Sequence, residues 1–409
     1  MGWKFRWLAG ALLSAATLCC LSCSNTTTGT AVTTPEDLYV TTAGDATLQG
    51  YVITPSSGAL TLVGQGIASG LQPTAMVITP ALDTLFVASV GGLCPGTTTT
   101  SSCLGSFTIN ADGSTSAAST TTIPLGENPV AMAINAAGTY LFVANQGTFS
   151  DPTSGTISVF AISGTTATEI SGSPFQDLAT PGVPNNSGIG PSGLAISASD
   201  NYLYVSNNFN NTVSAFTISS SGALTQFASL PYLAGTNPTG LTITPSGSFL
   251  FAANSGSNNV SAFAICDKVT NTCSNAGAPD GTLTEVTGQP FAAGLGPSVP
   301  LVDPSGNFLY VVDKVSNQVS QYRISSQTGV LAPISPAAVS TGPTPVALVI
   351  RVGSTVITST GGQTEYLYVA NNGGTSLSTF SFDSTVGQLT VLGGTTTTDG
   401  GNPSALTAR

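Results

Sequence analysis

The 409-residue sequence has no histidine, and charged residues make up only 6% of it, against about 25% in an ordinary soluble protein. Seven residues are Lys or Arg and 18 are Asp or Glu, which gives a net charge of −11. Because no basic patch is available to neutralise phosphates, we expect no nucleic-acid partner. The missing histidines exclude His-based triads, and no Walker loop is present, so we expect no metal and no cofactor.

Helical periodicity is also missing beyond the first residues of the chain. Glycine, serine, threonine and asparagine take the place of charged residues, while hydrophobic residues still make up 41%. This composition favours many short strands joined by tight turns. The sequence therefore predicts an all-β protein with a sizeable core.

Residues 1–23 are typical of an export signal. Two cations form a positive n-region, and residues 7–18 are an apolar stretch too short for a comfortable membrane span. The serine directly before Cys23 resembles the lipobox of bacterial lipoproteins, which implies cleavage before Cys23 and its lipidation; an ordinary cleaved signal peptide is the alternative. Residues 24–35 then form a flexible tether. We expect an exported protein of the cell envelope, anchored at the outer membrane by lipid alone, or periplasmic or extracellular.

The remaining cysteines occur as two close pairs. Cys94 and Cys103 flank one loop rich in Gly, Thr and Ser, and Cys266 and Cys273 flank another. Close pairs are typical of an oxidising compartment, so we predict two disulfides that each staple a short loop. Zinc is the alternative, but neither pair has CxxC spacing.

One pattern recurs seven times beyond residue 35. Its clearest element is an aromatic residue in an apolar run, followed three residues later by a short polar residue that can cap a strand end. In six copies a proline opens an apolar run upstream, which is where a strand tolerates proline. The marker aromatics are Tyr39, Phe86, Phe142, Tyr204, Phe251, Tyr310 and Tyr368.

Each copy predicts four antiparallel strands at a period of 47 to 62 residues, which is the signature of a propeller blade. A β-sandwich would not repeat one unit seven times, and a β-helix has a shorter repeat. The first marker lacks an inner strand before it, and residues 402–407 supply one at the other end, so the N- and C-terminal strands should share one blade. We therefore expect residues 36–409 to form a monomeric seven-bladed β-propeller.

The strand motif resembles the YVTN repeat, as in residues 203–207 (Leu-Tyr-Val-Ser-Asn) and 367–371 (Leu-Tyr-Val-Ala-Asn). The whole blade resembles the lactonase-type seven-bladed propellers, which include bacterial 6-phosphogluconolactonase and related cycloisomerases. The resemblance covers residues 36–409. For members with lactonase or lactonising activity it implies His, Arg or Glu side chains at the channel mouth.

A phosphorylated sugar lactone needs cations to hold its phosphate, and few are present. We therefore expect a non-catalytic binding or scaffold module of the envelope, with no catalytic residues; the alternative is a lactonase-like hydrolase or isomerase acting on a sugar lactone. Asp313, Lys314 and Arg323 are candidates for a small charged site, with a solvated ion pair as the other interpretation. The cations beyond the export signal are Lys268, Lys314, Arg323, Arg351 and Arg409.

Three long loops are expected on one face of blades two and three, at residues 90–103, 146–155 and 171–190. Extra loop length on a rigid scaffold favours recognition, although surface loops also tolerate insertion without function. We predict a contact surface for a protein or glycan partner here. Its candidate residues are Phe149, Asp151, Phe175 and Asp177.

Overall fold

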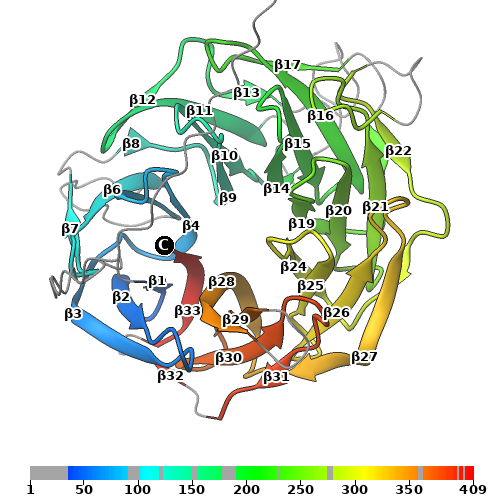
Figure 1. The fold of residues 1–409 in the computed structure, drawn as a ribbon. Coiled ribbons are helices and arrows are strands. Elements are labelled where there is room, and N and C mark those ends of the chain that lie inside the picture. The colour runs from blue at the N-terminus through cyan, green and yellow to red at the C-terminus, as the bar shows by residue number, and fades with distance from the viewer. Residues whose placement is uncertain are drawn as a thin grey trace, which may run out of the picture. The chain divides into compact units, whose positions relative to one another are not determined.

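The described part of the chain consists of β-strands joined by turns, with no helix among the described residues. The strands form seven separate antiparallel sheets, arranged as blades around a common axis (Figure 1). The predicted export signal, Cys23 and the predicted tether lie outside the described residues. The computed structural model describes residues 36–90, 102–118, 123–148, 151, 154–176, 190–227, 231–273, 280–357, 363–393, 396–398 and 401–409.

Every blade has the same strand order from the axis outwards, with its first strand innermost (Figure 1). The inner strands, for blades one to seven, are β33 (Pro403–Ala408), β4 (Pro73–Ile78), β9 (Pro129–Ile134), β14 (Pro191–Ile196), β19 (Pro238–Ile243), β24 (Pro297–Val302) and β28 (Pro345–Ile357). The second strands are β1 (Asp37–Thr42), β5 (Thr84–Ser89), β10 (Tyr140–Asn145), β15 (Tyr202–Asn207), β20 (Phe249–Asn254), β25 (Phe308–Asp313) and β29 (Gln363–Asn371).

The outer half of each blade completes the four-stranded sheet, and in five blades the outermost strand is divided in two. The third strands are β2 (Thr47–Ile53), β6 (Cys103–Ile109), β11 (Thr156–Ser163), β16 (Thr212–Ile218), β21 (Asn259–Ile265), β26 (Gln318–Ile324) and β30 (Ser376–Asp383). The outermost are β3 (Leu60–Ala68), β7 (Thr115–Ala117) with β8 (Ile123–Pro124), β12 (Thr166–Glu169) with β13 (Phe175–Gln176), β17 (Leu224–Gln226) with β18 (Tyr232–Leu233), β22 (Leu283–Glu285) with β23 (Phe291–Ala292), β27 (Leu331–Ser340), and β31 (Thr390–Val391) with β32 (Thr396–Thr397).

The two ends of the propeller meet in blade one, as predicted. β33 pairs antiparallel with β1, from Leu38 opposite Ala408 to Thr42 opposite Pro403. The sheet order β3-β2-β1-β33 therefore combines strands from both ends of the chain. The prediction of a seven-bladed propeller closed by its terminal strands is confirmed, and closure pairs the inner edge of β1 with β33.

Proline begins all seven inner strands. It lacks an N–H group, so the first position of a strand is where it costs no ladder hydrogen bond. The residue before it often has a left-handed backbone, with φ of 59° at Asn128, 52° at Asn237 and 50° at Asn402. Asparagine tolerates this conformation better than most side chains do. The Asn-Pro pairs therefore fix how the chain enters these blades.

In six blades the short polar residue at the end of the second strand joins that strand to the third, whereas Ser89 of blade two donates to the carbonyl of Ser69. The Nδ2 group of Asn207 donates to Thr212 Oγ1 at 3.0 Å and to Ser214 Oγ at 2.8 Å, and Asn207 is fully buried. Asn145 and Asn371 bond to their third strands in the same way. These side chains therefore stabilise their blades from within.

The marker aromatics pack between blades. They are completely buried, and the hydroxyl of Tyr204 donates to the carbonyl of Gly281 in the following blade at 3.0 Å. A Cβ atom on Gly281 would come within 2.5 Å of the Tyr202 ring. Because that space belongs to the neighbouring blade, the Gly-x-Leu turn needs glycine here for blade-to-blade packing.

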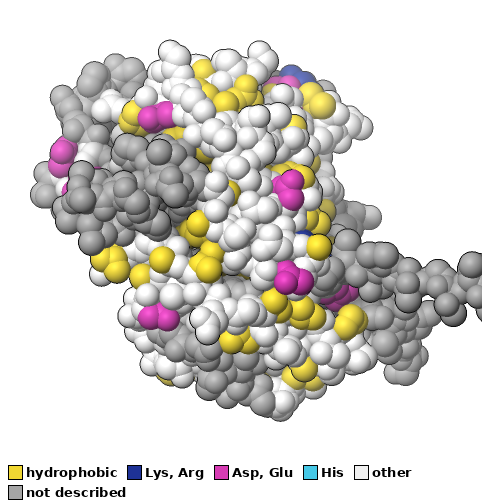
Figure 2. Space-filling view, turned by 90° about the vertical axis from the view of Figure 1, so that its left-hand side faces the viewer, with side chains coloured by type: hydrophobic (Ala, Val, Ile, Leu, Met, Phe, Trp, Pro, Cys, Tyr) yellow, Lys and Arg dark blue, Asp and Glu magenta, His cyan; other side chains and the backbone are white. Residues whose placement is uncertain are grey.

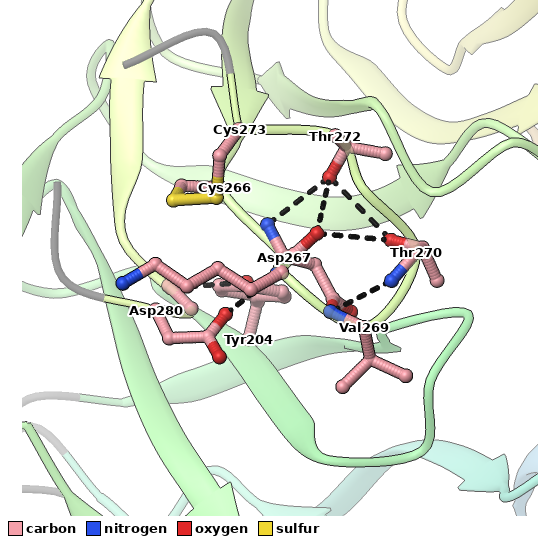
Figure 3. Close-up of a disulfide and its surroundings, with 10 residues drawn as sticks. Tyr204, Cys266, Asp267, Val269, Thr270, Thr272, Cys273 and Asp280 are labelled. Atoms are coloured by element: carbon pink, nitrogen blue, oxygen red, sulfur yellow. Dashed lines mark hydrogen bonds between the residues drawn. A yellow bond between two sulfur atoms is a disulfide. The ribbon is translucent and has the colours of Figure 1, made fainter. Parts of the chain in front are cut away.

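The disulfide between Cys266 and Cys273 is present, as predicted, and closes a short loop after β21 (Figure 3). Cys103 is also disulfide-bonded, whereas Cys94 lies outside the described residues, so their pairing stays a prediction. Among the residues described, none lies in a helix long and apolar enough to cross a membrane.

Candidate functional site

The inner strands offer little acid–base chemistry. They surround the axis of the ring (Figure 1), and the only ionisable residue within their bounds is Arg351 of β28. On the side of the molecule in Figure 2, most of the coloured acidic side chains lie apart from one another, and one of them adjoins a cation. A catalytic site must therefore be sought where the ends of strands bring charged residues together.

Four charged residues lie at one end of blade one, on the face that carries the turns between first and second strands: Glu36 pairs with Arg351 of blade seven, and Asp37 with Arg409 on the side that faces blade two. We call that face the lower face, and we call Glu36, Asp37, Arg351 and Arg409 the seam cluster. Arg351 Nη2 lies 3.8 Å from Glu36 Oε1, and Arg409 Nη2 contacts Asp37 Oδ2. These are the two ion pairs found among the described residues, so the paired charges lie around the lower end of blade one.

The pair of Asp37 and Arg409 is structural. Asp37 is completely buried, and burial raises the pKa of its carboxyl while the Arg409 guanidinium opposes that shift. At the same position in blade six, the ring of Phe308 packs against Gly387 of the next blade, whereas Asp37 lies against Gly113. An ion pair therefore replaces an aromatic–glycine contact in blade one, and it ties β33 to β1.

The pair of Glu36 and Arg351 is more accessible. The side chain of Glu36 is 19% exposed and that of Arg351 is 29% exposed. Glu36 Oε2 and Arg351 Nε are buried and have no hydrogen-bond partner among the described residues. The Glu36 carbonyl accepts a 2.7 Å hydrogen bond from the N–H of Ile53, which fixes the backbone. A carboxylate and a guanidinium with unused bonding positions are thus held side by side.

Two other carboxyl groups have perturbed pKa values but are closed to solvent. Burial raises the pKa of Asp313 to about 6, against the hydrogen bonds from Ser320 and Gln318. Burial and the nearby Asp303 carboxylate raise the pKa of Glu365 to about 7, and Glu365 is only 4% exposed. A substrate cannot reach either group directly, so we regard the Glu36 and Arg351 pair as the candidate site.

The buried Glu365 carboxyl should make stability depend on pH. The pKa of Glu365 is higher in the folded protein than the ordinary glutamate value of 4.5. Its contribution to stability is therefore complete below that value and lost as pH rises through about 7. We expect Glu365→Gln to reduce the fall in the free energy of unfolding between pH 4.5 and 8 by about 2–3 kcal/mol. Urea unfolding at both pH values measures this. Glu127→Gln, at an exposed site, is the control. The prediction would be contradicted if the free energy of unfolding changed equally with pH in the unchanged protein and in both variants.

The charged residues singled out in blade six do not form one site. Arg323 is paired with Phe308 at the lower end of the blade, and its guanidinium lies 4.8 Å from the centre of that ring. Asp313 is at the upper end, opposite Gln318, and Lys314 is exposed. Extended strands separate residues that are close in sequence, so both the charged site and the ion pair predicted there are wrong.

The predicted partner surface is only partly described. Phe149 and Asp177 lie outside the described residues. Asp151 is exposed and forms a β-bridge with Thr148 inside its loop. Phe175 belongs to β13 and packs against the core between blades three and four. The contact surface for a protein or glycan stays a prediction, with Asp151 as its one clearly exposed described residue.

The ring of seven four-stranded blades, joined through a shared terminal blade, defines a seven-bladed β-propeller. The family described as lactonase, 7-bladed beta-propeller, matches residues 32–187, 173–275 and 277–408. The chain belongs to this family. A comparison with curated protein sequences finds no match.

Solved structures share the fold at low sequence identity. A periplasmic gluconolactonase from Pseudomonas aeruginosa is 20% identical with a TM-score of 0.69, over 91% of this chain and 98% of that one. A candidate 6-phosphogluconolactonase from Bacteroides fragilis is 18% identical with a TM-score of 0.69, over 93% and 99%. A functionally unknown protein from Desulfotomaculum acetoxidans is 15% identical with a TM-score of 0.62, over 91% and 98%. At such identities the likeness shows the fold alone.

Family membership corrects the main functional expectation from the sequence. The absence of histidine and the scarcity of cations favoured a non-catalytic binding or scaffold module, but the match to the lactonase family supports the alternative, a lactonase-like hydrolase. The few cations are scattered along the sequence, and only ring closure brings Arg351 of blade seven beside Glu36 of blade one. Glu36 and Asp37 were not predicted from the sequence as candidate site residues. Asp37 was a visible signal, because blades three to seven have an aromatic residue at the corresponding position, two residues before the marker aromatic.

Proposed function

We propose that the protein is a lactonase-type hydrolase acting on a sugar lactone. The observation that carries this proposal is the family match. Its three matched segments together cover residues 32–408 except residue 276. The fold shared with a periplasmic gluconolactonase agrees with it. The Glu36 and Arg351 pair is the proposed reaction site, because it is the accessible ion pair of the seam cluster.

The proposed chemistry needs only a base and a hydrogen-bond donor. The Glu36 carboxylate takes a proton from water as the water oxygen bonds to the lactone carbonyl carbon. The Arg351 guanidinium stabilises the negative charge that develops on the carbonyl oxygen. The bond between that carbon and the ring oxygen then breaks, and the proton passes to the leaving oxygen. The product is the open-chain sugar acid.

The seam cluster suits a lactone without a phosphate group. A phosphate is held by several cations, and Arg409 already contacts the buried Asp37. Only Arg351 remains for a substrate, and the proposal assigns it to the carbonyl oxygen. We therefore propose an uncharged sugar lactone, such as D-glucono-1,5-lactone, as the substrate class.

The test is hydrolysis of D-glucono-1,5-lactone and its 6-phosphate, corrected for spontaneous ring opening. We expect kcat/KM to be at least about tenfold higher for the unphosphorylated lactone, because Arg351 alone cannot hold a phosphate well. No acceleration of either lactone over buffer would refute a lactonase. A preference for the phosphate would contradict the proposed substrate only.

We further propose that the enzyme works in the cell envelope, after export directed by residues 1–23 and with Cys23 as its lipid attachment point. The disulfide between Cys266 and Cys273 supports an oxidising compartment. Mass spectrometry of the mature protein tests this, since lipidation adds acyl mass at a new N-terminal cysteine.

A further inference from the structure

A cleft of about 540 Å³ opens between blades five and six on the lower face. Its walls come from Ala264 of β21 and from four further segments. These are the turn between β19 and β20 (246–249), the disulfide-closed loop (270–272), the end of β22 and the residues after it (284–287), and the turn between β26 and β27 (326–328). Its volume lies within the range of about 300–1,000 Å³ that is usual for small-ligand sites.

The loop that forms one wall is held in place before any ligand arrives (Figure 3). The disulfide between Cys266 and Cys273 closes it. Asp267 is 1% exposed; its Oδ1 atom accepts the N–H of Thr270 at 3.3 Å, and its own N–H donates to Thr272 Oγ1 at 3.0 Å. A wall fixed in this way loses little conformational entropy when a ligand binds.

The lining of the cleft is polar and almost uncharged. Ten of its fourteen residues are Ser, Thr, Asn or Gln, and Glu285 is the only charged one. Hydroxyl and amide groups both donate and accept hydrogen bonds, which matches the hydroxyl groups of a sugar. Without a cation, and with one carboxylate, the cleft disfavours anionic ligands. Phe249, at the edge of the core, adds a small apolar contact.

We propose that this cleft, hereafter the blade-five cleft, binds a neutral carbohydrate. It shares no residue with the seam cluster, and both open on the lower face of the ring. A neutral glycan bound in the cleft holds the protein with its lower face towards that glycan. The blade-five cleft is thus a second site, independent of lactone hydrolysis.

The test is a glycan array carrying neutral glucans, galactans and chito-oligosaccharides beside acidic polygalacturonate and alginate. Full-length protein and the double variant Asn271→Gly/Gln327→Ala are compared. Asn271 has a φ of 59°, which glycine adopts without strain, and the Gln327 side chain is exposed. We expect binding to at least one neutral glycan, weakened at least about tenfold in the double variant at an unchanged melting temperature.

Glu285→Gln has a matched control in Glu169→Gln, because Glu285 lies opposite Phe263 as Glu169 lies opposite Phe160 in blade three. Only Glu285→Gln is expected to change binding of the neutral glycan. The proposal would be overturned if the protein bound only acidic glycans or no glycan at all. It would also be overturned if the double variant bound the neutral glycan as well as the unchanged protein does. Glu36→Gln is expected to bind the same glycan as well as the unchanged protein, so failure of the lactonase proposal does not affect this test.

Discussion

Deletion of residues 402–409 is expected to abolish the cooperative unfolding transition and to yield aggregates. The deletion removes β33, which pairs with β1 from Leu38 to Thr42. Leu38 and Val40 are completely buried in the intact ring, and their strand would become an exposed apolar edge. Such edges pair with other chains. The deletion also leaves the buried Asp37 without Arg409. An unpaired buried charge lowers the free energy of unfolding by about 3–5 kcal/mol.

Size-exclusion chromatography and thermal melting followed by circular dichroism measure this effect. Arg409→Ala separates its two causes, because it keeps the strand pairing and removes only the partner of Asp37. We expect Arg409→Ala to remain folded but to lose about 3 kcal/mol of stability, and Asp37→Asn to recover part of that loss in the double variant. A truncated protein that melts and elutes like the full-length chain would show that the shared blade does not hold the ring closed.

Glu36→Gln is expected to lower kcat for D-glucono-1,5-lactone by at least about a hundredfold, the lower end of what a general base contributes. Glutamine keeps the shape of the side chain but cannot take the proton from water. Glu36 lies at the surface end of β1 and is partly exposed, so its replacement should leave the melting temperature unchanged. Stopped-flow detection of proton release, corrected for spontaneous hydrolysis, gives kcat.

Arg351→Met is expected to reduce kcat by a similar factor, because the carbonyl oxygen then loses its charged donor. Arg323→Met is the matched control, since this guanidinium lies over Phe308 in blade six, and its kcat should stay within about twofold of the original. Full activity in both Glu36→Gln and Arg351→Met would move the reaction away from the seam cluster, and a lactonase would then need another site.

The sequence alone determined the blades and their closure. A propeller blade is built from strands that are neighbours in the chain, so the local pattern of proline, marker aromatic and turn glycine predicts each sheet. Pro73 and its six counterparts all begin inner strands, and residues 402–407 were recognised as the strand missing from blade one. The loop between Cys266 and Cys273 is equally local, which is why its disulfide was predictable.

Only the tertiary structure decided what lies between blades. Glu36 and Arg351 come from opposite ends of the sequence and meet because ring closure places blade seven beside blade one. Asp313 and Arg323 are close in sequence and yet lie at opposite ends of blade six, because each strand carries the chain across the whole blade. Ring closure places the first and last blades side by side although they are far apart in the sequence. Sequence periodicity therefore specified the scaffold, and packing between blades specified the charged site.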